Sequence, residues 1–231
     1  KRQALNVISI KLTEAEIGLA ASGLLLGSIF SSFFAGDISD RLGRKWILVL
    51  DAIIFTIIPI LLAVATFNFI TFLTWRIIEG FALGMDNVLS GIFIAEMVPT
   101  NKRNSYVATQ QLMTVIAQFS AFWIGYALTP LKLWQLMFAL GAIPALIILL
   151  LRIKIPESPR WLTSKGRIKE AKEILSKFFG VNVSEDELNS IYSELLKESR
   201  NLPSWKDLFS SKFRKYAIIA ILAGLFMQFS G

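Results

Sequence analysis

The sequence contains neither cysteine nor histidine. The absence of cysteine excludes disulfides, thiolate nucleophiles and cysteine metal sites. The absence of histidine means that any group exchanging a proton near neutral pH has to be a carboxyl group rather than an imidazole. The sequence also offers no nucleophile–base pair, metal cluster or phosphate-binding loop. We therefore expect a protein that is not an enzyme and that carries no cofactor.

Apolar residues, by contrast, are abundant and occur in long runs. They make up 54% of the 231 residues, which exceeds the roughly 45–50% of a soluble domain. Apolar runs of about 18 residues or more predict transmembrane helices. We predict spans at about residues 17–36, 46–66, 69–98, 105–128 and 134–151, and the start of another at residue 216. The sequence thus indicates a multi-pass protein of the cell membrane, in contact with the lipid bilayer.

The net charge of +7 is unevenly distributed along the chain. The segments 36–45 and 99–104 are rich in arginine and lysine, whereas residues 129–133 contain Lys132 alone. The positive-inside rule places the two basic segments in the cytoplasm. This topology explains the basic excess, so we expect no nucleic-acid partner.

The segment after the fifth predicted span is different in kind. Residues 153–215 are polar, and helical spacing of apolar residues predicts amphipathic helices at 168–179 and 185–196. We therefore expect three parts: a transmembrane bundle at 1–152, a cytoplasmic helical domain at 153–215, and the start of a second bundle at 216–231.

Four motifs occur in order between and beside the spans. They are Gly36–Lys45 (Gly-Asp-Ile-Ser-Asp-Arg-Leu-Gly-Arg-Lys), Arg76-x-x-x-Gly80-x-x-x-Gly84, Glu96-x-x-Pro-x-x-x-Arg103 and Pro156–Arg160 (Pro-Glu-Ser-Pro-Arg). Together they resemble the major facilitator superfamily, and the last resembles its sugar porter-like branch. The resemblance implies an all-α membrane bundle, of which this chain would be a fragment covering about helices 2–7 of 12.

The same resemblance implies roles for charged residues and glycines in the motifs. The charged residues would form a cytoplasmic gate network of salt bridges, made of Asp40, Arg41, Arg44, Glu96, Arg103, Glu157 and Arg160. The glycines would serve close helix packing, and they are Gly36, Gly43, Gly80 and Gly84. A separate stripe of small residues at 23, 27, 31 and 35 would let a neighbouring helix approach the first span closely.

Ionisable residues inside a span are costly and usually functional. The third predicted span contains Arg76, Glu79 and Asp86, which we consider proton-coupling candidates. Glu79 and Asp86 share one helix face about 10 Å apart. Asp86 is a candidate proton site or substrate contact; alternatively it forms a structural pair with Arg76 or with a helix that this sequence does not include. In sugar porters that resemble this chain, the arginine matching Arg76 pairs with an acid on the first helix.

Glutamines suggest the kind of solute. Gln111 and Gln118 share one face of the fourth predicted span, and Gln228 lies in a segment similar to the Gln-Gln-x-x-Gly of the seventh sugar porter helix, with Met227 in place of the first glutamine. Amides both donate and accept hydrogen bonds, which suits the hydroxyls of a polyol. The three glutamines are therefore candidate substrate-binding residues, although amide bonds between helices are the alternative.

The expected function is secondary active transport of a small polar solute by alternating access. A sugar is the expected substrate and a proton the expected coupling ion. An aspartate at the position of Asp86 is more typical of phosphate and organic-ion relatives, so a phosphate, organic-acid or organic-cation transporter remains an alternative. A non-transporting sugar sensor on a porter fold is another.

Overall fold

The computed structural model describes residues 13–65, 68–98, 100–131 and 134–179, with single positions at 193, 210, 214, 215, 218, 219 and 222. The chain divides into two compact units, residues 1–182 and 183–231, and all helices considered below belong to the first. The predicted helix at 185–196, the predicted span from residue 216 and Gln228 lie outside the continuous described ranges.

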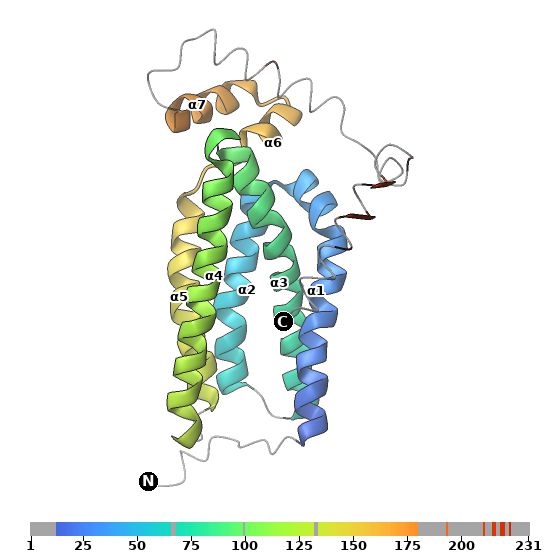
Figure 1. Ribbon diagram of the computed structural model, residues 1–231, viewed down its shortest axis with the longest axis vertical. Coiled ribbons are helices and arrows are strands. Elements are labelled where there is room, and N and C mark those ends of the chain that lie inside the picture. The colour runs from blue at the N-terminus through green and yellow to red at the C-terminus, as the bar shows by residue number, and fades with distance from the viewer. Residues whose placement is uncertain are drawn as a thin grey trace. The chain divides into compact units, whose positions relative to one another are not determined.

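The first unit is a bundle of long helices with two short helices at one end (Figure 1). The long helices are α1 (Glu14–Leu42), α2 (Arg44–Val64), α3 (Phe69–Met97), α4 (Thr100–Leu128) and α5 (Trp134–Lys154), with a 3-10 turn η1 (Thr129–Leu131) after α4. The short ones are α6 (Pro159–Ser164) and α7 (Ile168–Phe179). Within the described ranges, all five long helices are long and apolar enough to cross a membrane. The architecture is therefore an all-α membrane bundle.

The junction between α1 and α2 is much shorter than the segment 37–45 that separates the first two predicted spans. α1 continues through the charged residues to Leu42, and α2 begins at Arg44. Only Gly43 separates them, with a φ of 105° that side-chain-bearing residues rarely adopt. Charged residues mark the edge of the bilayer, but they do not end a helix, so α1 continues through them as far as Leu42.

Small residues bring α1 and α3 into close contact. A Cβ added to Gly80 would meet the carbonyl oxygen of Leu24, and one added to Gly84 would meet that of Ser28. From the α1 side, a Cβ on Gly27 would meet the backbone of Ile77. In each of these contacts a glycine of one helix lies against the backbone of a larger residue of the other, and the missing side chain of the glycine is what permits the close approach.

Gly36 does not belong to this contact, contrary to the expectation that it serves helix packing. Within the part of the chain that the structure describes, a Cβ on Gly36 would meet no atom within 4 Å. The glycine lies one position beyond Ala35, which is fully buried in the core between α1, α2 and α3. Since successive helical residues point about 100° apart, the neighbour of a packed residue can face away from the contact.

The remaining helices are packed to different degrees. α2 lies between α3 and α5, with Ile47, Leu48 and Leu62 buried. α4 contacts α3 and α5 but exposes large apolar side chains along its length, including Phe119 and Phe122. Such a surface is a liability in water and is expected where a helix faces lipid or another helix of the membrane domain.

Candidate functional site

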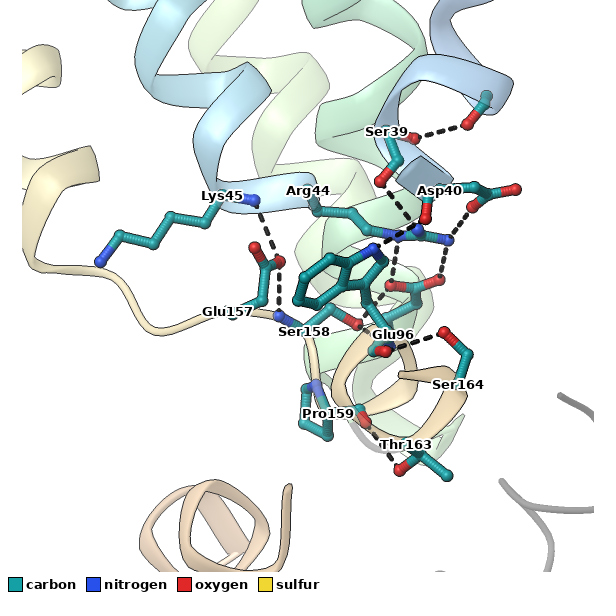
Figure 2. Close-up of polar contacts among 12 residues, drawn as sticks. Ser39, Asp40, Arg44, Lys45, Glu96, Glu157, Ser158, Pro159, Thr163 and Ser164 are labelled. Carbon is teal, nitrogen blue, oxygen red and sulfur yellow. Dashed lines mark hydrogen bonds and ion pairs between the residues drawn. The ribbon is translucent and has the colours of Figure 1, made fainter. Parts of the chain in front are cut away.

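The first candidate site is a polar network at the α6 end of the bundle (Figure 2). Arg44, at the start of α2, has a side chain that is only 11% exposed. Its Nε donates to Glu96 Oε2 of α3 at 3.2 Å, and its Nη2 lies 2.6 Å from Asp40 Oδ1 of α1. Its Nη1 donates to the carbonyl oxygen of Ser39 at 3.2 Å. One guanidinium therefore joins three helices.

The segment leading into α6 binds to the same group of helices. Ser158 Oγ donates to Glu96 Oε2 at 2.5 Å, and the backbone N–H of Lys45 donates to Glu157 Oε1 at 3.0 Å. Trp161 Nε1 donates to the carbonyl oxygen of Asp40 at 2.9 Å. Figure 2 shows these contacts converging beside Arg44. They fasten α6 to α1, α2 and α3 at once.

Sequence reasoning identified the charged members of this network but not Ser158 and Trp161. Ser158 is fully buried and caps α6, because its hydroxyl accepts from the N–H of Trp161 at 3.4 Å. A serine directly before a proline is a typical helix start, so the Ser-Pro step inside the motif was the available signal. A Cβ on Gly43 would meet the Glu157 carboxylate, which gives that glycine a second reason to be present.

Arg103 and Arg41, which the resemblance assigned to the same network, lie differently. Arg103 Nη2 donates to the carbonyl oxygen of Ala95 at 2.6 Å, and its Nε is buried without a partner among the described residues. Arg41 is exposed on the last turn of α1, and Arg160 is partly buried on the first turn of α6. The structure thus brings together Asp40, Arg44, Glu96 and Glu157.

The second candidate site consists of two ion pairs inside the bundle. Arg76 Nη1 lies 2.7 Å from Glu79 Oε2, one turn further along α3, and its guanidinium lies 5.9 Å from the ring centroid of Phe138 on α5. Arg152 Nη2 of α5 lies 2.5 Å from Asp86 Oδ1 of α3. Among the described residues, Asp86 is thus paired not with Arg76 but with a basic residue near the end of the fifth helix, just beyond the predicted span at 134–151.

A cavity of about 380 Å³ connects these two pairs. It is bounded by α2, α3, α4 and α5, and its lining includes Glu79, Asp86 and Arg152. The rest of the lining is mainly apolar, with Pro59 and Phe138 among it. The arrangement can hold buried charge next to a space large enough for several water molecules.

The glutamines on α4 differ in their exposure. Gln111 and Gln118 are exposed. The neighbouring Gln110 is partly buried, and its Nε2 donates to Ser90 Oγ of α3 at 2.9 Å. Gln110 makes the bond between helices that had been considered for Gln111, because it lies one residue earlier and so faces α3.

Comparisons with known proteins agree with this bundle. The described helices resemble the xylose transporter XylE from E. coli in a partially occluded inward-open conformation, with a TM-score of 0.74 and 27% identity over 84% of this chain and 50% of that one. The fold is therefore that of a major facilitator superfamily membrane protein. Residues 3–231 match the family model described as "Sugar (and other) transporter". The chain belongs to this sugar transporter family.

Curated relatives point to the same family. The arabinose-proton symporter of Bacillus subtilis is 33% identical over 222 residues, which are 93% of this chain and 47% of that protein. The D-xylose transporter of Levilactobacillus brevis is 34% identical over 220 residues, with the same coverage of 93% and 47%. The chain thus spans about half the length of the curated relatives that it matches. These relatives are named as transporters rather than as enzymes.

Proposed function

We propose that the complete protein is a secondary active transporter that moves a sugar across the cell membrane by alternating access, coupled to protons. The membership of residues 3–231 in the sugar transporter family carries this proposal. The names of two relatives support the finer statement, since one is a symporter of arabinose with protons and another transports D-xylose. In this arrangement residues 153–215 lie in the cytoplasm.

The proposed sugar contacts are Gln111, Gln118 and Gln228. The exposure of Gln111 and Gln118 on α4 supports this, because a solute can reach them from outside the first bundle. Gln110 is left out of the set, since its amide is engaged with Ser90. Each amide would donate to one sugar hydroxyl and accept from another.

The proposed gate is the network around Arg44. Alternating access requires contacts on the cytoplasmic side that form in one state and break in the other. Exposed ion pairs contribute too little to bias such an equilibrium. The side chains of Arg44 and Glu96 are only 11% and 5% exposed, so breaking this pair has an energetic consequence large enough to distinguish two states.

The proposed coupling residues are Arg76, Glu79 and Asp86. The carboxylates of Glu79 and Asp86 line a cavity, and each is paired with an arginine. Protonation of a carboxylate removes its attraction to the arginine beside it, which is a direct way for a proton to change helix contacts.

The test is uptake of labelled xylose, arabinose and glucose by the complete protein in proteoliposomes, with and without an inward proton gradient. We expect accumulation above equilibrium for at least one sugar, and competition by unlabelled sugar but not by phosphate. Asp86→Asn should abolish accumulation and spare exchange of sugar across the membrane, while Asp37→Asn, at an exposed position of α1, serves as the control.

The outcomes separate the alternatives. Competition by phosphate or by an organic ion, with none by sugar, would assign the protein to another substrate class of the same superfamily. Sugar binding without any exchange would indicate a sensor. Unchanged accumulation by Asp86→Asn would remove Asp86 from the coupling mechanism.

A further inference from the structure

Asp51 is an acidic residue in the interior of the bundle that none of the sites above uses. It lies on α2, about 10 Å along the helix from its first residue. Its relative exposure is 1%, and its Oδ2 atom is buried without a hydrogen-bond partner among the described residues. A buried carboxylate without a donor is among the least favourable groups in a protein interior.

The ionisable groups that act on Asp51 come from two other helices. Asp86 of α3 and Arg152 of α5 both interact with it electrostatically. The donors of Arg152 are directed elsewhere: its Nη2 donates to Asp86 Oδ1 at 2.5 Å, and its Nη1 donates to the carbonyl oxygen of Leu48 at 2.8 Å. Arg44, two turns earlier on α2, is paired with Asp40 and Glu96. Asp51 thus interacts electrostatically with an ion pair that is already formed.

Charge counting then favours one proton in this cluster. With every group ionised, Asp51, Asp86 and Arg152 carry a net charge of about −1 inside the membrane domain. With one carboxyl neutral, the cluster is neutral. Two carboxyls that share a site rarely ionise together, and Asp86 is the one whose charge is compensated by a close guanidinium.

We propose that Asp51 is a proton-binding site of the transporter and that the Asp86–Arg152 pair controls the release of its proton. In the structure described here, Asp51 holds the proton and Arg152 compensates the ionised Asp86. If Arg152 moves from Asp86 toward Asp51, the proton passes from the carboxyl of Asp51 to the carboxylate of Asp86. One O–H bond breaks and one forms, and the cluster stays neutral throughout.

The difference in exposure gives the two carboxyls different tasks. The side chain of Asp86 is 26% exposed and lines the cavity of about 380 Å³, where it can exchange a proton with water. Asp51 is closed off and stores the proton. This division extends the proposed function, because it adds a store to the coupling residues, but the presence of the proton on Asp51 can be tested without any sugar.

The direct test is infrared difference spectroscopy of the complete protein in liposomes near neutral pH, recording the C=O stretch of a protonated carboxyl. We expect the wild-type protein to show a band that Asp51→Asn lacks and that the control Asp37→Asn keeps. Asp86→Asn should weaken the band, because Arg152 then has no carboxylate partner and attracts the ionised form of Asp51. Asparagine resembles a neutral aspartic acid, so Asp51→Asn should melt at a temperature close to that of the wild type.

The outcomes distinguish this inference from the proposed function. A full band in Asp51→Asn overturns the inference. If Asp51→Asn fails to fold, Asp86→Asn decides, and an unchanged band in that variant overturns it. If the bands behave as expected but no variant takes up sugar, the proton site stands and the proposed function fails. If uptake is proton-driven while the band does not depend on Asp51 or Asp86, the proposed function stands and this inference falls.

Discussion

Arg44 and Arg152 both join neighbouring helices, yet their surroundings differ. Arg44 has two carboxylates and a carbonyl oxygen as partners, and Glu96 receives a further donor from Ser158. Arg152 has one carboxylate and one carbonyl, with a second carboxyl nearby that it does not bond. A buried network in which every polar group has a partner keeps one rigid arrangement. A network that contains a carboxyl group without a partner can instead change its protonation state. This difference supports the two roles proposed above, gating for Arg44 and control of proton release for Arg152.

The largest expected effect comes from replacing each arginine by methionine. Arg44→Met leaves the nearly buried Glu96 without its cation, so we expect the free energy of unfolding to fall by about 4 kcal/mol. Arg152→Met should cost only about 1–2 kcal/mol, because Asp86 is a quarter exposed and can take up a proton. Chemical unfolding of the detergent-solubilised protein measures both. Equal losses would remove the distinction between the two arginines.

Gly43→Ala tests whether the network depends on the junction beneath it. Alanine at this position would have to adopt a φ of 105°, and its Cβ would meet the Glu157 carboxylate. We therefore expect the free energy of unfolding to fall by about 2–3 kcal/mol. Gly36→Ala is the matched control, since a Cβ there meets nothing within 4 Å and alanine favours helix. Thermal unfolding compares the two variants. A Gly43→Ala protein as stable as Gly36→Ala would contradict the strain argument.

Ser158→Ala tests whether the network around Arg44 holds α6 in place. It removes both the hydrogen bond to Glu96 and the cap of α6. We expect the free energy of opening α6 to fall by about 2 kcal/mol, which makes exchange of its amides roughly 30-fold faster. Hydrogen exchange of the α6 amides measures this. Ser164→Ala is the control, because among the described residues its hydroxyl bonds only to the carbonyl oxygen of Trp161 one turn earlier. Similar exchange in both variants would show that Ser158 does not hold α6.

The smallest effect concerns Glu16, far along the chain from both arginines. The backbone N–H and the hydroxyl of Thr13 donate to its carboxylate, at 2.8 and 2.9 Å, and these bonds lower the pKa of Glu16 below its usual value. The stabilisation of the first turn of α1 is therefore complete above the ordinary pKa of a glutamate and is lost as the pH falls through the lowered pKa. Hydrogen exchange of that turn against pH measures it, and Glu16→Gln should abolish the dependence.

The main elements of the fold could be predicted from the sequence because apolar runs and basic loops are long-range patterns. The approximate positions of the five long helices followed from the apolar runs, and the helix at 168–179 followed from the helical spacing of its apolar residues. The end of α1 could not, because Asp40 and Arg41 are compatible with either a loop or a helix in water. A single glycine, Gly43, decides where the helix stops.

The partners of individual side chains were harder to predict. Arg76 and Glu79 are three residues apart on one helix, so their pairing follows from helical geometry and could have been expected. The pairing of Asp86 with Arg152 joins α3 to α5 and depends on how the helices are rotated about their axes, which no local pattern determines. The same rotation selects Gln110 rather than Gln111 for the bond to α3.

The single-residue connection at Gly43 leaves no slack between α1 and α2. α6 is bonded to both of them, through Trp161 to the carbonyl oxygen of Asp40 and through Glu157 to the N–H of Lys45. While these bonds are formed, a displacement of any one of the three helices is transmitted to the other two, and they move as one rigid unit. In the proposed transport cycle, any rearrangement that precedes the opening of the Arg44 network would therefore have to occur where packing is sparse, as along α4.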